Sequence, residues 1–391
     1  MKIIIILTFI LLLEIVIFIL TKKLSKCKWI ITKENLHPLF NKQKFNYFKK
    51  NNYCYSLGWD KKPKKRDFDL IDDKKNFYSI DKKSFRYSYN KNKKNIIASF
   101  GDSYTFCRQV KNNETWQELI SNKKKIFLSN YGVGNYGLDQ AYLKYKKTKL
   151  SKNTKIVIFG FVPETICRIQ SGWKNYLEFG NIHGFKPFCK IINKKFLIFK
   201  NPLKPSDNFS TLHEVIKKTQ KIDRFYKEKY LKNLLKFPYL FYFLKNFILN
   251  LKIYYKFITT KNKDNISYLN NNLFPIIMKN NIKFSHKLYK EEHSKSLLDK
   301  LLYKIQNDIN KKNLECYFVI FPQLFDLEIS SRKNYQKFFD NIKNKYNIID
   351  LTNYFLKKNY HKLYINDKYG GHLNKTGNIF VSNIINHITK L

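Results

Sequence analysis

The chain has 391 residues and a formal net charge of +46, because 75 Lys and Arg face only 29 Asp and Glu. Only six of the basic residues are arginine, whose forked guanidinium nucleic-acid readers favour, so the lysine excess indicates a compositional bias and no specific nucleic-acid partner is expected. With 43% hydrophobic and 17% aromatic residues, the chain is too apolar for a disordered polycation, and a folded core is expected.

The chain opens with an apolar run from Ile3 to Leu20, in which Glu14 is the only charge. A run of about 18 residues suffices to cross the hydrocarbon core of a bilayer. No small-residue cleavage signature follows, so residues 1–21 predict an uncleaved single-pass transmembrane anchor rather than a removed signal peptide. Lysines on both sides blunt the positive-inside rule, and an extracytoplasmic domain is the favoured orientation. Glu14 is interpreted as a tolerated charge.

Residues 22–94 are rich in Lys, Asn and Tyr and include the turn-forming run 57–63, which predicts a linker and N-terminal extension rather than a core. The six cysteines of the chain show no CxxC pair and no Cys/His spacing of the zinc type. A metal site is therefore not expected, and buried free thiols are the favoured interpretation, with one disulfide left open.

From residue 95 onward, short apolar runs alternate with amphipathic stretches. The apolar runs predict five strands, and helices are predicted between and after them. Continuous apolar strands separated by helices are typical of a parallel sheet that is covered on both faces. We therefore expect residues 95–391 to form a flavodoxin-like three-layer α/β/α domain with a five-stranded parallel sheet. The predicted strands are 96–100, 126–128, 155–160, 316–321 and 348–351, and the predicted helices are 114–120, 138–145, 290–310, 335–345 and 375–388.

A long helical insertion at 165–290 interrupts this alternation of strands and helices. Its aromatic run at 237–249 is punctuated and followed by Lys245, Lys252 and Lys256, which favours an amphipathic helix over a second membrane span. Two interpretations stay open: this helix packs onto its own domain, or it lies on the bilayer beside the anchor. It is also a candidate lid.

Two segments at the ends of the domain carry residues suited to chemistry. The first strand is followed by Gly101-Asp102-Ser103, which places a serine at the carboxyl edge of the sheet, where open α/β folds bind ligands. The tripeptide also fits an ordinary helix-capping turn. A serine nucleophile needs a base, and His372 lies on a glycine-hinged loop directly before the last helix, with Asp367 upstream.

Together these two segments resemble the SGNH/GDSL hydrolase family, over residues 95–165 and 313–390 and more weakly over 78–86. The resemblance implies that Ser103 attacks an ester carbonyl while His372 acts as base and then as acid, with no cofactor. It also implies an acyl-ester substrate on a glycan or a lipid, and leaves open whether water or another hydroxyl accepts the acyl group. The remaining implied site residues are Asp367, which orients the histidine, and the oxyanion-binding backbone of Ser103 and Asn135, with Gly134 adjacent.

Two positions depart from the family pattern. Members commonly place the orienting Asp three residues before the His, where this chain has Tyr369, and Asp367 lies five residues before it. The third block of the family offers an Asn side chain to the oxyanion, whereas this chain has Glu164, which when ionised cannot donate a hydrogen bond. Either another donor substitutes, or Glu164 is used differently, or catalysis is impaired. A catalytically decayed SGNH-fold scaffold at the membrane is therefore the alternative.

A nucleotide-binding alternative uses Gly132, Gly134 and Gly137, which match GxGxxG between a strand and a helix. The strand is the second of the domain rather than the first. The acid expected about 20 residues later is also absent. A nucleotide site is therefore the weaker hypothesis, and the serine–histidine site is favoured over it.

Overall fold

The computed structural model describes residues 1–27, 29–33, 41–71, 74–263, 265–365 and 371–389. Its centre is a five-stranded sheet in the order β11-β10-β7-β5-β6, with every neighbouring pair parallel. This order is the flavodoxin-like arrangement, and it confirms the predicted fold class. The strands are β5 (Asn95–Gly101), β6 (Phe127–Asn130), β7 (Ile156–Phe161), β10 (Glu315–Ile320) and β11 (Asn347–Asp350).

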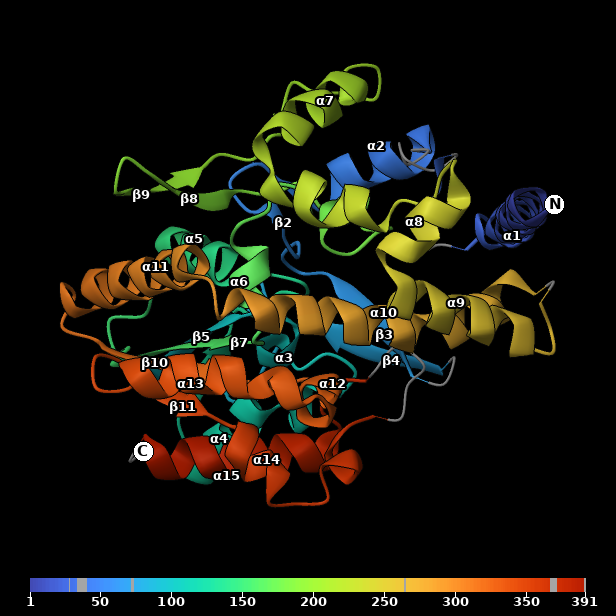
Figure 1. The fold of residues 1–391 in the computed structure, drawn as a ribbon. Helices are drawn as coiled ribbons and strands as arrows, with labels where there is room; N and C mark the ends of the chain where they lie inside the picture. Colours follow the sequence, from blue (N-terminus) through green and yellow to red (C-terminus); the bar gives the residue numbers. More distant parts are fainter. Residues whose placement is uncertain (28, 34–40, 72–73, 264, 366–370, 390–391) are drawn as a thin grey trace.

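Helices cover both faces of this sheet, with α5 and α11 on one side and α4 and α15 on the other (Figure 1). Consecutive strand residues point to opposite faces, so Val157 enters one core cluster and Ile158 the other. Helix α13 also packs on the face covered by α5 and α11, and α14 packs on the face covered by α4 and α15. The bounds are α4 (Trp116–Lys124), α5 (Leu138–Lys147), α11 (Glu292–Asn310), α13 (Lys333–Ile342), α14 (Thr352–Leu356) and α15 (Lys375–Ile388).

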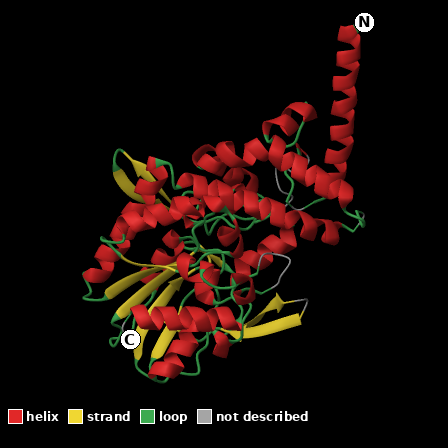
Figure 2. Ribbon diagram, turned by 60° about the horizontal axis from the view of Figure 1, so that its bottom comes forward, coloured by secondary structure: helices red, strands yellow, loops and turns green. Residues whose placement is uncertain are grey.

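The predicted anchor forms helix α1 (Lys2–Leu24), which projects from the rest of the molecule (Figure 2). Its most apolar 18-residue window has a mean hydropathy of 3.4. The helix is therefore long and apolar enough to cross a membrane, although a signal sequence has the same properties. Most of its side chains are exposed, because only its C-terminal half packs on the protein, through Ile17, Thr21 and Leu24.

The stretch expected to be a linker differs from that prediction. Its described residues form a helix and two hairpins, and aromatic side chains such as Phe45 and Phe85 are buried against the main core. These elements hide this role in the sequence because each is short and has no more than three apolar or aromatic residues. The elements are α2 (Lys42–Asn51), β1 (Tyr53–Cys54), β2 (Gly58–Trp59), β3 (Arg66–Ile71) and β4 (Lys74–Ser79).

The insertion is mostly helical but also contains a β-hairpin, formed by β8 and β9. The hydrophobic run around residue 240 forms two consecutive helices rather than one, since Pro238 and Asn246 lie at helix boundaries. All six cysteines of the chain are free thiols, as expected. The elements are α6 (Thr165–Arg168), β8 (Phe188–Ile192), β9 (Lys195–Phe199), α7 (Leu212–Ile222), α8 (Tyr239–Lys245), α9 (Phe247–Thr259) and α10 (Ile266–Leu288).

Candidate active site

Ser103 is the first residue of the short helix α3 (Ser103–Phe106), directly after β5. The turn requires a glycine at 101, because a Cβ there would lie 1.9 Å from the carbonyl oxygen of Gly160 on the neighbouring strand. Asp102 caps the helix, accepting a hydrogen bond from the Tyr104 backbone N–H at 2.9 Å. The helix-capping turn therefore places Ser103 at the carboxyl edge of the sheet, where the residue is 7% exposed.

The structure brings Ser103 and His372 together, although 269 positions separate them in the sequence. The distance between Ser103 Oγ and His372 Nε2 is 2.9 Å, within hydrogen-bond reach. The histidine is held by the loop before α15, where a Cβ at Gly371 would lie 2.0 Å from the Ile365 carbonyl oxygen. Asn374 then caps α15, accepting from the Gly377 N–H at 2.9 Å, so the loop ends in a fixed position.

Gln109 is the partner of the other ring nitrogen. Its Oε1 lies 3.0 Å from His372 Nδ1 and 3.1 Å from the backbone nitrogen of His372. A backbone N–H can only donate, so the oxygen and not the amide nitrogen of Gln109 must face the histidine. Nδ1 therefore carries a proton and donates it to Gln109, which leaves Nε2 as an acceptor for the Ser103 hydroxyl. This is the tautomer that a general base requires.

The turn that presents Gln109 is held by two charged side chains. Gln109 has a left-handed backbone, with φ of 70°. The buried Arg86 guanidinium donates to the carbonyls of Phe106 and Cys107 at 2.7 and 2.6 Å. From β3, Asp69 accepts from the Gln109 N–H at 3.2 Å. No sequence motif pointed to Gln109, but Arg86 belongs to the upstream segment that carried the weaker family resemblance.

Asp367 lies outside the described residues, so its role as the orienting acid stays a prediction. Burial, then the positive charges of Arg108 and Arg168, lower the pKa of His372 well below its usual value. A neutral glutamine at Nδ1 supplies no negative charge to offset these effects. The geometry therefore favours a neutral imidazole that is ready to accept a proton even in mildly acidic solution.

Glu164 is buried and forms an ion pair with Arg168, with Glu164 Oε2 and Arg168 Nη2 2.6 Å apart. Burial acts to raise the pKa of Glu164, but the nearby charges, chiefly that of Arg168, hold it below its ordinary value, so the side chain is an anion and not a donor. Arg168 also donates to the Tyr136 carbonyl at 3.1 Å and lies 3.7 Å from Asp102. Of the three explanations left open for Glu164, the structure favours a role other than oxyanion binding, because the carboxylate positions Arg168. Arg168 was not among the predicted site residues.

Arg168 thus ties together the two backbone segments expected to bind an oxyanion. One segment ends in Asp102-Ser103, and the other holds Gly134-Asn135. Asn135 has φ of 67° and is exposed, and Gly134 has open space where a Cβ would stand. In the described part of the chain, neither the backbone N–H of Ser103 nor that of Asn135 has a hydrogen-bond acceptor. Both N–H groups are therefore available to a ligand.

A pocket of about 270 Å³ adjoins Asn135. Its walls come from the N-terminal extension, with Phe48 and Trp59, and from the insertion, where the His183 ring stacks on Phe48 with centroids 5.0 Å apart. Segments outside the five-stranded core thus shape the space next to the candidate oxyanion site.

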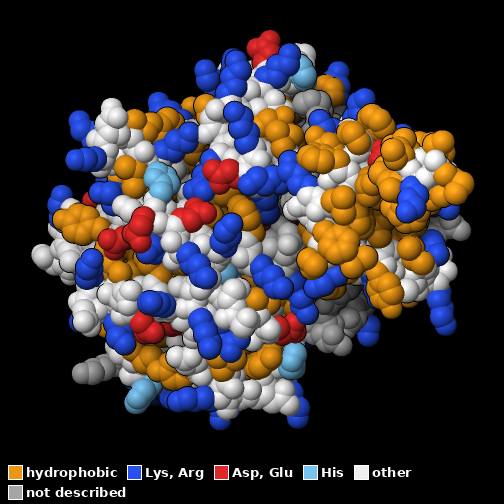
Figure 3. Space-filling model, in the orientation of Figure 1, with side chains coloured by type: hydrophobic (Ala, Val, Ile, Leu, Met, Phe, Trp, Pro, Cys, Tyr) orange, Lys and Arg blue, Asp and Glu red, His pale blue; other side chains and the backbone are white. Residues whose placement is uncertain are grey.

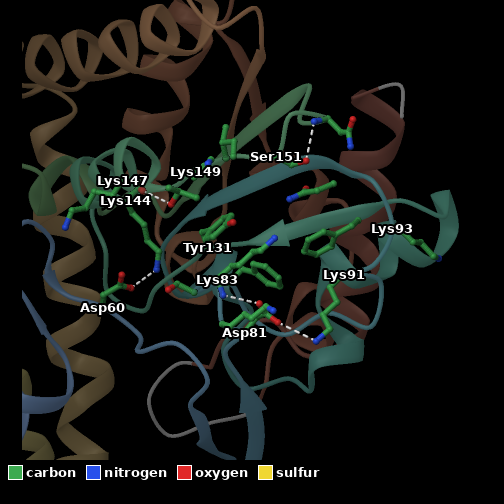
Figure 4. A pocket seen from close by; sticks show the side chains of 18 of the residues that line it. Asp60, Asp81, Lys83, Lys91, Lys93, Tyr131, Lys144, Lys147, Lys149 and Ser151 are labelled. Atoms are coloured by element: carbon green, nitrogen blue, oxygen red, sulfur yellow. Dashed lines mark hydrogen bonds and ion pairs between the residues drawn. The ribbon is translucent and has the colours of Figure 1, made fainter.

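A larger cavity of about 1020 Å³ lies at the opposite edge of the sheet. Residues that begin strands line it, including Asn95 and Phe127, together with several lysines (Figure 4). Asp60 and Asp81 neutralise two of these lysines, in the pairs Lys144–Asp60 at 2.6 Å and Lys91–Asp81 at 3.5 Å. A seven-residue strand spans roughly 20 Å, so this cavity is remote from Ser103.

The glycines of the GxGxxG pattern have packing roles. A Cβ at Gly132 would lie 2.3 Å from the Phe106 backbone nitrogen, and one at Gly137 would lie 2.4 Å from Asp139 Oδ1. These close approaches, to the end of α3 and to the first turn of α5, account for two of the three glycines without a nucleotide.

A second serine–histidine–acid cluster lies in another part of the fold. His286 on α10 contacts Asp326 through Nε2 at 2.8 Å and Ser331 through Nδ1 at 2.9 Å. Both His286 and Asp326 are fully buried. The other oxygen of Asp326 accepts from the Gln323 N–H at 2.7 Å, capping α12 (Leu324–Glu328). This cluster joins three helical segments, and its polar groups already have partners.

No protein-family model and no curated protein matches the chain. Among solved structures, it is similar to a protein assigned to the lipolytic G-D-S-L family from Desulfitobacterium hafniense, with 8% identity and a TM-score of 0.34, over 74% of this chain and 98% of that one. It is also similar to a member of the same family from Veillonella parvula, with 10% identity and a TM-score of 0.33, over 75% of this chain and 98% of that one.

Proposed function

We propose that the chain is a membrane-anchored, SGNH-type serine ester hydrolase or O-acyltransferase. The observation that carries the proposal is the Ser103–His372–Gln109 chain of contacts at the carboxyl edge of the sheet, in which the histidine tautomer is fixed with Nε2 toward the serine hydroxyl. Helix α1 would hold the domain at the membrane, on the extracytoplasmic side.

In the first step, Ser103 Oγ attacks the carbonyl carbon of an acyl ester while His372 Nε2 takes the hydroxyl proton. The carbonyl oxygen becomes an oxyanion, which the backbone N–H groups of Ser103 and Asn135 bind. One such donor is typically worth about 10²–10³ in rate. Collapse of the intermediate breaks the bond to the alcohol, which leaves with the proton from His372. Water or an acceptor hydroxyl then removes the acyl group by the reverse sequence.

Among the described residues, Gln109 takes the position of the orienting carboxylate in this scheme. It fixes the ring and the tautomer but cannot stabilise the imidazolium by charge. A buried glutamine therefore supports a slower enzyme than a carboxylate would, with a base that stays neutral at lower pH. Acyl groups on glycans or lipids are the proposed substrates, and the pocket beside Asn135 is the proposed binding space for one side of the ester.

The test is a panel of aryl esters of increasing acyl length, hydrolysed by the full chain in detergent, with His372→Ala as the inactive control. Turnover that depends on His372 supports the proposal. Turnover equal in the two proteins, or present in neither, contradicts it.

The alternative is a non-catalytic scaffold that keeps the fold. The paired Glu164 favours it, because the third-block side-chain donor is absent. An ester panel without turnover, together with a stable fold, is the result that this alternative predicts.

A further inference from the structure

Helices α8 and α9 carry an exposed apolar face next to the anchor. Figure 3 shows hydrophobic side chains gathered over α1, α8 and α9, on one side of the molecule. Their exposed fractions range from 44% to 71%. We call these residues the α8–α9 face: Phe237, Phe241, Leu244, Phe247, Ile248, Leu251, Tyr255 and Ile258.

Helix α9 is apolar on two sides. Its inner side buries Ile253, Tyr254 and Phe257 against α1 and α10. Its outer side presents Leu251 and Tyr255 to solvent, four positions apart and thus on one stripe. A helix with apolar side chains on two opposite sides is typical of an apolar environment on both of them. The domain supplies that environment on the inner side only.

Contacts with α1 place this face at membrane depth. Glu14, the one charge within the apolar run, accepts hydrogen bonds from the backbone N–H groups of Tyr239 and Leu240 at 2.5 and 2.7 Å, at the start of α8. Glu14 precedes Leu20, the last residue of the apolar run, by six residues, which is about 9 Å at the rise of an α-helix. The N-terminus of α8 therefore lies at the same depth, inside the hydrocarbon boundary.

Two further contacts fix the docking of α1. Thr21 Oγ1 and the Tyr254 hydroxyl are 2.5 Å apart, and the rings of Phe18 and Tyr239 have centroids 5.3 Å apart. The α8–α9 face is thus continuous with the exposed surface of the candidate span rather than separate from it. Amphipathic helices that lie in a membrane interface bury their apolar face by about 5–10 Å, the same depth as Glu14 implies.

We propose that α8 and the outer side of α9 lie in one leaflet of the bilayer beside α1, with the α8–α9 face among the lipid acyl chains. Exposed Lys245 and Lys252 border the face and would meet anionic headgroups. Glu14 then serves as a link between the span and the interfacial helices, which corrects its interpretation as a merely tolerated charge. Of the two interpretations left open for the aromatic run, both apply: the inner side packs on the domain, and the outer side faces lipid. The proposal rests on the proposed anchoring by α1, and not on catalysis.

The test compares two tyrosines of nearly equal exposure, Tyr255 on α9 at 67% and Tyr303 on α11 at 64%. Each is changed to cysteine, as Tyr255→Cys and Tyr303→Cys, in a full chain with Cys54→Ser, because the other five native thiols are buried. An environment-sensitive fluorophore is attached, and the protein is reconstituted in vesicles of phosphatidylcholine and phosphatidylglycerol, with or without a nitroxide on the acyl chains. Circular dichroism checks that both variants are folded.

The proposal predicts flotation of both variants with the vesicles. The label at 255 should shift its emission to shorter wavelength and lose most of its intensity to the nitroxide, whereas the label at 303 should be quenched only by aqueous iodide. Flotation with equal behaviour at both positions overturns the lipid-facing assignment and leaves the anchor standing. A label at 255 that neither quencher reaches indicates a protein partner or a second copy, and also overturns it. Failure of both variants to float contradicts the anchoring and this proposal together, while ester turnover remains a separate measurement.

Discussion

The described residues include the Ser103–His372 and Ser331–His286 clusters, which differ in what surrounds the histidine. His286 has the carboxylate partner expected of a catalytic triad, yet both groups are fully buried and join helices. Among the described residues, the Nδ1 partner of His372 is a neutral glutamine, and Ser103 stands at the carboxyl edge of the sheet beside two backbone N–H groups without an acceptor there. Residue types alone would favour the His286 cluster, whereas the position at the carboxyl edge of the sheet and the two backbone N–H groups favour the His372 cluster.

The largest expected effect separates the two serines. Ser103→Ala should lower kcat for ester hydrolysis by about 10⁴-fold or more, because it removes the attacking hydroxyl. Ser331→Ala should change kcat less than about twofold, since its hydroxyl serves only a contact between helices. Steady-state kinetics on both variants measures this, and a similar loss in both would refute the distinction.

The second prediction concerns stability. Asp326→Ala leaves the buried Nε2 of His286 without its partner and should lower the free energy of unfolding by about 1–3 kcal/mol. The activity of the molecules that remain folded should not change. Asp340→Ala is the matched control, because the Asp340–Lys343 pair is more than half exposed and should contribute less than about 1 kcal/mol. Denaturant titration checks both, and equal destabilisation would contradict the structural role of the His286 cluster.

The third prediction concerns Glu164. Glu164→Asn removes the anion that pairs with buried Arg168, and should destabilise the fold by about 3 kcal/mol while also lowering kcat, because Arg168 ties the two oxyanion segments together. A rise in kcat would instead show that residue 164 acts on the oxyanion directly and that its carboxylate weakens the site.

Substitution of Gln109 should change kcat by a smaller factor than substitution of Ser103. Gln109→Ala should lower kcat about 10²-fold with little change in KM, since the imidazole loses its fixed orientation. Gln109→Glu should restore orientation and raise the pKa of His372, because a carboxylate favours the imidazolium. The acid limb of the pH–rate profile should then move upward. Gln140→Ala, which removes another buried glutamine, is the control and should leave the profile in place.

The smallest expected effect is a shift in pH dependence. The acid limb of kcat/KM should lie well below pH 6.5, because the pKa of His372 is lowered by burial and by Arg108 and Arg168. Removing a positive charge favours protonation, so Arg108→Gln should move this limb upward by a fraction of a pH unit, screened by solvent. Arg66→Gln, at an exposed arginine of β3, should not move it. A downward shift in the Arg108 variant would contradict the electrostatic explanation.

Much of the fold could be predicted from the sequence, because each central strand is a short apolar run and Ser103 and His372 stand next to glycines that the chain requires. Gln109 could not, since its role depends on a left-handed turn that a buried arginine from a different segment holds. Arg168 was missed for a similar reason, as an arginine four residues after a glutamate looks like an ordinary helix pair. The short elements between 41 and 79 were not predicted because each is short and has few buried residues.

The most direct test of the central claim is covalent labelling of the full chain with a fluorophosphonate, followed by peptide mapping. A nucleophile activated by a neutral imidazole should react, and the modification should map to the peptide that contains Ser103, with none on the peptide that contains Ser331. Modification of Ser331, or an unmodified Ser103 in folded protein, would contradict the assignment of the active site to the Ser103–His372 cluster.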